Sequence, residues 1–183
     1  MNSIAVKNIK QGKVVLYPTD TIWGLGCDAT NEKAIDKIFK IKQRSESKSL
    51  IILVDSIDML KNYVESVPEA VLDILKHATR PTTIVYPYPK GLAKNVIAND
   101  NTVAIRIVKH NFCEGLIKEI GKPIVSTSAN ISGKPTPKSF AEISQAILDS
   151  VDYVVALQQD SNSEKSSRIL KINKDGSIEV IRD

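Results

Sequence analysis

Short runs of β-branched and aliphatic residues alternate along this chain with segments whose apolar residues recur at helical spacing. Such an alternation constrains the fold strongly, because strands separated by helices pair into a sheet that the helices then cover. The runs that predict strands cover residues 14–17, 50–54, 83–86, 103–108, 124–125, 153–156, 169–172 and 178–181. We therefore predict an α/β fold, with a mixed parallel and antiparallel sheet and helices packed on it.

Capping patterns predict where several helices begin and end. N-terminal caps are predicted at Asn31, at Ser66 with Glu69, and at Ser139 with Glu142. The last of these helices should reach about residue 148, and a helix over residues 112–120 should end at Gly121. The last two strands should form a hairpin around Asp175-Gly176. The polar segment 158–167 predicts a surface loop, so we expect residues 1–183 to form one domain.

Composition narrows the class of protein without choosing a function. In 183 residues, 25 Lys and Arg against 21 Asp and Glu give a formal charge of +4, which is compatible with an anionic ligand. Two separated cysteines and two histidines favour neither a disulfide scaffold nor a structural zinc site. No apolar run is long enough for a membrane span, and lysines interrupt the N-terminal region where a signal peptide would be apolar. We therefore expect a cytoplasmic protein with no membrane contact.

The first polar loop, residues 18–29, leaves a predicted buried strand with the sequence PTDTIWGLGCDA. Its threonine hydroxyls and backbone N–H groups can bond a small polar ligand, and its glycines allow close approach. The alternative is a structural turn that buries Trp23, which is the commoner use of a short glycine loop. A P-loop is excluded, because the GxxxxGK[ST] pattern is absent.

The basic segment, residues 40–49, places Lys42, Arg44 and Lys48 between a helix and a buried strand. Cations held there could offset the charge of a triphosphate while an anionic nucleophile approaches it. The alternative is a solvated helix end, because lysine and arginine also complement the helix dipole. The segment alone does not decide between them.

The hydroxyl-rich segment, residues 123–135, reads PIVSTSANISGKP and follows another predicted buried strand. Small hydroxyl side chains can bond phosphate oxygens or an amide without filling a cavity. The alternative is a turn stabilised by its own serine and asparagine side chains. Polar groups after strand ends tend to form binding sites in α/β sheets, so we expect the three segments to lie together.

Together, PTDTIWGLG, the KxR…KS pattern of the basic segment and STSANISGKP resemble the YrdC/TsaC-like family of threonylcarbamoyl-AMP synthases. The resemblance covers about residues 14–138 and continues more weakly to the C-terminus. It implies a twisted open sheet with flanking helices and a large concave cavity. Because the chain stops at Asp183, it resembles the short, single-domain form of the family.

The resemblance implies an ATP-dependent nucleotidyltransferase. Such an enzyme makes threonylcarbamoyl-AMP and pyrophosphate from L-threonine, bicarbonate or CO₂, and ATP, and a transferase complex then uses the product for N6-threonylcarbamoyladenosine (t6A) in tRNA. Mg²⁺ would be carried with ATP, without protein ligands of its own. Catalysis would consist of positioning and charge stabilisation by Lys42, Arg44 and Lys48, with no covalent catalytic residue.

Site residues follow from the same resemblance, position by position. The implied L-threonine contacts are Thr21, Arg106, Ser126 and Ser166. The implied ATP contacts are Arg44, Lys48, Thr102, Ser128, Asn130 and Thr136, with Lys42 as a nearby cation. The chain departs from the family pattern at three places. Leu53 stands where a histidine is frequent, and the segment before Thr83 lacks the usual glycine. The segment Ser166-Ser167-Arg168 differs from the commoner Ser-Thr followed by apolar residues.

Two other functions remain compatible with these segments. A non-catalytic protein that binds double-stranded RNA or nucleotides could use the same basic residues. A paralogue could also act on another acceptor, as does the related domain of carbamoyl-transferring hydrogenase-maturation proteins. The pairing of Arg44 and Lys48 with Ser128 and Asn130 favours the synthase.

Overall fold

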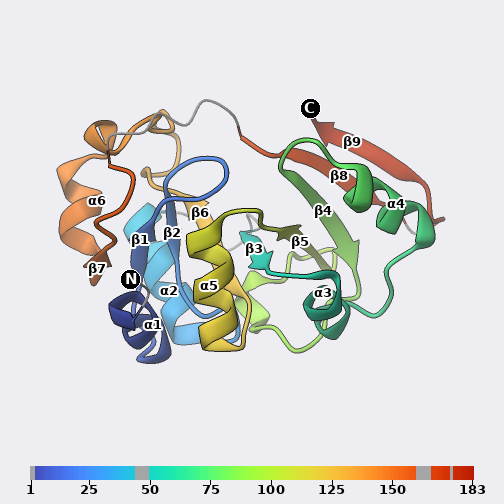
Figure 1. The fold of residues 1–183 in the computed structure, drawn as a ribbon, viewed down its shortest axis with the longest axis horizontal. Coiled ribbons are helices and arrows are strands. Elements are labelled where there is room, and N and C mark those ends of the chain that lie inside the picture. The colour runs from blue at the N-terminus through green and yellow to red at the C-terminus, as the bar shows by residue number, and fades with distance from the viewer. Residues whose placement is uncertain (1–2, 44–49, 160–165, 174) are drawn as a thin grey trace.

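Within residues 3–43, 50–159, 166–173 and 175–183, which the computed structural model describes, nine strands form one mixed sheet (Figure 1). The strands are β1 (Val15–Tyr17), β2 (Gly24–Gly26), β3 (Ile51–Val54), β4 (Thr82–Pro87), β5 (Thr102–Ile107), β6 (Ile124–Ser128), β7 (Tyr153–Val154), β8 (Arg168–Ile172) and β9 (Ile178–Arg182). The α-helices are α1 (Ser3–Lys10), α2 (Glu32–Lys42), α3 (Ile57–Tyr63), α4 (Glu69–His77), α5 (Asn111–Ile120) and α6 (Gln145–Ser150). Short 3₁₀ helices cover Lys94–Val96 and Phe140–Glu142.

The sheet confirms the predicted mixed α/β class. Its order is β7-β1-β2-β6-β3-β5-β4-β8-β9, and the pairs β1–β7, β3–β5 and β4–β8 are parallel. The other neighbouring strands run antiparallel, including the predicted hairpin of β8 and β9. In Figure 1 the strand direction changes from almost vertical at β1 to a shallow slope at β9, so the sheet is strongly twisted. The two ends of the order, β7 and β9, are not paired with each other, so the sheet is open.

The two faces of the sheet differ in what covers them. On β5, Val103 and Ile105 point into the largest core cluster, which α2, α3 and α4 complete. The opposite face is covered by α1 and α5 around β1, β3 and β6. Successive side chains of a strand alternate between faces, so Ala104 and Arg106 lie on this second face. No part of α5 covers Ala104 and Arg106, and both residues line a cleft.

Several predicted ends of helices are confirmed, because the local chemistry decides them. The Asn31 side chain accepts a hydrogen bond from the backbone N–H of Ala34 at 3.1 Å and begins α2. Gly121 adopts a φ of 72° and donates to the carbonyl of Ile117, which ends α5. All eight predicted runs coincide with strands to within a few residues.

Both predicted capping boxes are wrong. Helix α4 begins at Glu69 behind Pro68, because a residue before proline favours extended backbone and Ser66 therefore lies too early. Glu142 accepts a hydrogen bond from the backbone N–H of Lys138 at 2.9 Å, one residue before the expected partner Ser139. That segment forms a single 3₁₀ turn, and α6 starts only at Gln145.

Four elements were not predicted: α1, β2, α3 and the short 3₁₀ helix Lys94–Val96. Strand β2 has the sequence Gly-Leu-Gly, which has a low strand propensity, and tertiary contacts impose its conformation. A Cβ on Gly26 would lie 2.2 Å from the Val125 carbonyl oxygen and 2.4 Å from the Tyr17 hydroxyl. Glycine therefore lets β2 fit between β1 and β6. In the described ranges, no helix has both the length and the apolar character that crossing a bilayer requires.

Candidate functional site: a basic cleft on the uncovered sheet face

A cleft of about 390 Å³ lies on the sheet face that α5 leaves uncovered. Ile51, Val85 and Ala104 of three neighbouring strands contribute apolar side chains to its walls. All four predicted threonine contacts line it, together with two of the predicted ATP contacts: Thr21, Arg106, Ser126, Ser166, Ser128 and Thr136. The sequence therefore placed residues that are 145 positions apart, from Thr21 to Ser166, in one cleft.

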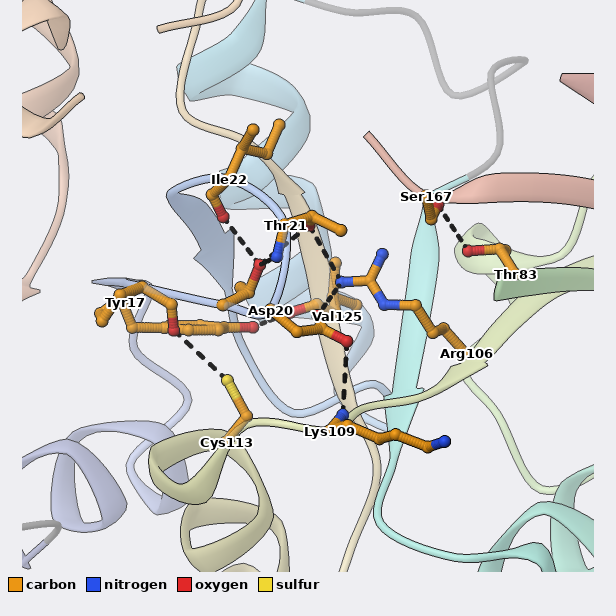
Figure 2. Close-up of polar contacts among 12 residues, drawn as sticks. Tyr17, Asp20, Thr21, Ile22, Thr83, Arg106, Lys109, Cys113, Val125 and Ser167 are labelled. Atoms are coloured by element: carbon orange, nitrogen blue, oxygen red, sulfur yellow. Dashed lines mark hydrogen bonds and ion pairs between the residues drawn. The ribbon is translucent and has the colours of Figure 1, made fainter. Parts of the chain in front are cut away.

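Arg106 is the most constrained cation of the cleft. Its side chain is only 3% exposed, and its Nη2 donates to the Asp20 carboxylate at 2.9 Å and to the Thr21 hydroxyl at 3.3 Å (Figure 2). Its Nε is buried and has no hydrogen-bond partner among the described residues. In Figure 2 the remaining terminal nitrogen points between Thr21 and Ser167. Arg106 can therefore donate from Nη1 to one more anionic oxygen, while both protons of Nη2 are already engaged.

The hydroxyl groups of the first polar loop give the cleft a defined acceptor. Thr19 donates its hydroxyl proton to the Ile22 carbonyl at 2.8 Å and accepts the backbone N–H of Thr21 at 3.0 Å. The Thr19 and Thr21 hydroxyl oxygens are 2.9 Å apart, and each hydroxyl has one proton. Thr21 must therefore donate to Thr19, which leaves its lone pairs for Arg106 and for a donor on a ligand.

The hydroxyl of Ser126 reaches the cleft because glycine faces it. A Cβ on Gly24 of β2 would lie 2.7 Å from Ser126 Oγ on the neighbouring strand β6. Ser126 is nearly buried, and it lies in register with Ile51 of β3. As predicted, a glycine of the first polar loop allows close approach. At Gly24 the group that approaches is the Ser126 side chain of the protein itself.

Lys42 reaches the hydroxyl-rich segment, as predicted, and its shortest hydrogen bonds there are to the backbone. It is 2% exposed, and its Nζ donates to the carbonyls of Ser128 at 2.5 Å and Asn130 at 2.8 Å. The backbone N–H of Ser132 donates in return to the Lys42 carbonyl at 2.9 Å. Lys42 therefore holds this segment in place. It does not belong to the described lining of the cleft. The other predicted cations, Arg44 and Lys48, lie outside the described residues.

Two predicted ATP contacts lie away from the cleft lining. Thr102 begins β5 on the same face as Arg106, but its hydroxyl donates to Asp100 at 2.6 Å. Asn130 lines a separate pocket of about 430 Å³, and its amide donates to the Lys134 carbonyl at 2.7 Å. Thr136 lines both spaces. The family resemblance implied one large concave cavity, whereas the described residues line separate pockets.

Arg182 is a cleft residue that the sequence did not indicate. Its Nε and Nη2 donate to the Ser167 carbonyl at 3.0 and 2.8 Å. Ile169 pairs with Arg182 while Leu170 pairs with Val180, so Ile181 is an extra residue in β9. Such a bulge turns neighbouring side chains to a common side, and both Ile181 and Arg182 line the cleft. The predicted strand ended at residue 181, and no pattern in the sequence marks the bulge.

The electrostatics of the cleft favour an anion. None of its lining residues in the described ranges is acidic, and Arg106 and Arg182 both line it. Burial lowers the pKa of Arg182, and the positive charge of Arg106 lowers it further. A bound anion would offset both effects. Asp20 already compensates Arg106, so Arg182 is the cation whose charge the described carboxylates leave uncompensated.

A family model for Sua5/YciO/YrdC proteins, described as telomere recombination, matches residues 7–183. The chain belongs to the Sua5/YciO/YrdC family. Two curated relatives are named threonylcarbamoyl-AMP synthase. The one from Pseudoalteromonas translucida is 36% identical over 166 residues, which is 89% of each chain. The one from Xanthomonas euvesicatoria is 32% identical over 182 residues, covering 98% of this chain and 95% of the relative.

Solved structures of the Sua5/YciO/YrdC family share the fold. A variant of P. abyssi Sua5 superposes with a TM-score of 0.88 at 28% identity, covering 98% of this chain and 55% of that one. P. abyssi Sua5 complexed with L-threonine gives 0.82 at 30% identity, covering 92% and 49%. This chain thus spans about half the length of those Sua5 chains. E. coli YciO, at 21% identity, gives 0.85 and supports the fold alone, with 98% and 87% covered.

Leu53 and Thr83 mark two of the places where the chain departs from the expected family pattern. They flank Arg106 in register, Leu53 on β3 and Thr83 on β4. Leu53 packs in the core cluster of α5, so a family histidine is here replaced by an apolar contact. Thr83 is fully buried, and its hydroxyl lies 2.8 Å from that of Ser167 (Figure 2). Thr83 therefore supports Ser167, which lines the cleft.

Proposed function

We propose that this chain is an L-threonylcarbamoyladenylate synthase. The proposal is carried by one observation: the four residues matched to threonine contacts, Arg106 among them, line one cleft. Two further findings support it. Relatives that align over most of the chain are named threonylcarbamoyl-AMP synthase, and the P. abyssi Sua5 structure contains L-threonine.

The threonine carboxylate binds Arg106 through Nη1 in this proposal, because Nη2 is held by Asp20 and Thr21. The Thr21 hydroxyl, which lines the cleft and keeps one lone pair beyond that used by Arg106, accepts from the amine or hydroxyl of the substrate. Ser126 is the second hydroxyl within the same lining. The cleft volume of about 390 Å³ is at the lower end of the range for small-molecule sites, which suits an amino acid and part of a nucleotide.

The nucleotide phosphates lie toward Arg182, Ser128 and Thr136. Arg182 carries the uncompensated positive charge, and the two hydroxyl residues line the same space. The threonine amine attacks bicarbonate, water leaves, and a carbamate forms. A carbamate oxygen then attacks the α-phosphorus of ATP, and the bond to pyrophosphate breaks. The protein positions the two anions and offsets their repulsion, which matches the absence of acidic groups from the described lining.

The rest of the reaction belongs to the same proposal. Mg²⁺ is carried by the ATP phosphates, which supply the oxygen ligands that Mg²⁺ prefers. Bicarbonate or CO₂ supplies the carbonyl group, and a separate transferase complex moves the product to tRNA. We place the protein in the cytoplasm, where ATP and tRNA are available. Arg44, Lys48, Thr102 and Asn130 remain proposed ATP contacts.

A binding protein for double-stranded RNA is the alternative from another functional class. The cleft argues against it, because Arg106 is almost fully buried and cannot follow an RNA backbone across a surface. The two functions differ in what raises the melting temperature. A synthase is stabilised by ATP and threonine together, whereas an RNA-binding module is stabilised by RNA alone.

The deciding experiment is incubation of the protein with ATP, Mg²⁺, bicarbonate and L-threonine, followed by detection of pyrophosphate and of the adenylate by mass spectrometry. We expect both products in equal amounts, and neither when threonine or bicarbonate is omitted. L-Valine, which lacks the hydroxyl, serves as the control amino acid. Pyrophosphate release that does not require threonine would show that the proposed substrate is wrong. Formation of an adenylate from an acceptor other than threonine would show the same.

A further inference from the structure

A buried carboxylate stands directly behind the cleft arginine. Asp20 Oδ1 accepts a hydrogen bond from Arg106 Nη2 at 2.9 Å, and the two side chains are only 7% and 3% exposed. We propose that Asp20 is a positioning residue, which orients Arg106 for the carboxylate of the amino-acid substrate. This inference rests on the proposed function, and it assigns a role to a residue that the sequence had left without one.

Asp20 is itself fixed from a second side. Its Oδ2 accepts the backbone N–H of Lys109 at 3.3 Å, three residues after Arg106 and just before α5 (Figure 2). One carboxylate therefore joins the first polar loop, the end of β5 and the approach to α5. The neighbouring Thr21 supplies the second acceptor for Arg106 Nη2. Both protons of that nitrogen are thus engaged by adjacent residues of one loop.

These contacts determine which part of the guanidinium is left for a ligand. With Nη2 occupied, the planar group cannot rotate freely, and its other terminal nitrogen points between Thr21 and Ser167 (Figure 2). The negative charge matters as well as the shape. A guanidinium that is 97% buried needs a counter-charge, and Asp20 is the carboxylate that pairs with it in the described chain.

Asp20 acts through Arg106 and not on the substrate. It is absent from the described lining of the cleft and instead lines a second pocket of about 520 Å³, beside Lys109 and the end of α4. The Asp20–Arg106 pair therefore stands between the two spaces. A carboxylate bound in the cleft would meet the guanidinium, while Asp20 stays on the far side of it.

The test is the isosteric variant Asp20→Asn, which keeps an oxygen for Arg106 but removes the charge. We expect the KM for threonine to rise roughly ten- to a hundredfold, the size of effect expected when a hydrogen bond between charged groups is weakened. The KM for ATP should stay within about twofold, because the loss is confined to one substrate. Asp20→Glu keeps the charge but moves it by one methylene, so it should show a smaller defect of the same kind.

Asp28→Asn is a matched control. Asp28 is also nearly buried, and it pairs with Lys122 at 3.1 Å, but it does not line the cleft. It should lower the melting temperature without changing the KM for threonine. If Asp20→Asn behaves in the same way, Asp20 is merely structural and the positioning role is wrong. If Asp20→Asn does not fold, Asp20→Glu decides between the same two outcomes.

Calorimetric titration with threonine separates this inference from the proposed function. A wild type that binds threonine in an Asp20-dependent way but makes no adenylate would overturn the function and keep the positioning role. An active wild type whose threonine affinity is unchanged in Asp20→Asn would overturn the positioning role alone. A wild type that neither binds threonine nor makes the adenylate would overturn both.

Discussion

At the scale of single residues, the sequence predicted which side chains meet but not what each of them bonds. Thr21, Arg106 and Ser126 are in one cleft as expected. The predicted guanidinium fork is only partly free, because Asp20 occupies Nη2, and no pattern in PTDT distinguishes a buried counter-ion from an exposed turn residue. Arg182 was missed because its orientation depends on a bulge, which is set by pairing between strands and not by local sequence.

Gly24→Ala tests how closely the residues of the cleft are packed. The new Cβ would lie 2.7 Å from Ser126 Oγ, so the serine hydroxyl must turn away from its present position. We expect the KM for threonine to rise about tenfold, which corresponds to about 1.4 kcal/mol of binding free energy. The melting temperature should fall only slightly, because the clash is mainly with the end of a side chain.

Steady-state kinetics of Gly24→Ala with each substrate varied in turn provide the measurement. Ser126→Gly in the same background removes the clashing hydroxyl and is the control for a backbone effect. If Gly24→Ala kept the threonine KM of the wild type, Ser126 would not contact the amino acid.

At the scale of elements, hydrophobic runs predicted the strands well because each central strand is buried on at least one face. Caps were predictable where one side chain decides the outcome, as at Asn31 and Gly121. They failed at Ser66, where Pro68 overrides the capping pattern. Strand β2 could not be predicted, because its glycines are required by close neighbours, Tyr17 and Val125 at Gly26 and Ser126 at Gly24, and have a low strand propensity.

The end of α2 gives a prediction at this scale. Lys42 bonds the carbonyls of Ser128 and Asn130, so Lys42→Met would leave these partly buried acceptors without this donor. We expect the free energy of unfolding to fall by about 1–3 kcal/mol, the range for losing hydrogen bonds from a charged donor. The KM for ATP should also rise more than the KM for threonine, because the displaced segment carries Ser128 and leads to Thr136.

Urea unfolding and steady-state kinetics measure the two effects of Lys42→Met. Lys40→Met is the matched control, since Lys40 is exposed in the last turn of the same helix. Loss of activity with unchanged stability would contradict a positioning role and would indicate that Lys42 contacts the phosphates directly.

At the scale of the whole molecule, the twisted sheet explains why distant segments share one site. Helices α1 and α5 cover one part of the second face, and the cleft occupies the part beside them. Arg106 comes from the middle of the sheet order, whereas Arg182 comes from its last strand, β9 (Figure 1). The two cations therefore approach the cleft from different strands, and we assign them to different anions: Arg106 to the amino acid and Arg182 to the phosphates.

The most direct test of this assignment is the KM for threonine and for ATP in Arg106→Lys and Arg182→Gln, measured side by side. Arg106→Lys keeps the charge beside Asp20 but loses the nitrogen that points into the cleft, so it should raise the threonine KM at least about tenfold and spare ATP. Arg182→Gln should raise the ATP KM and spare threonine. Equal effects of both variants on both substrates would contradict the account.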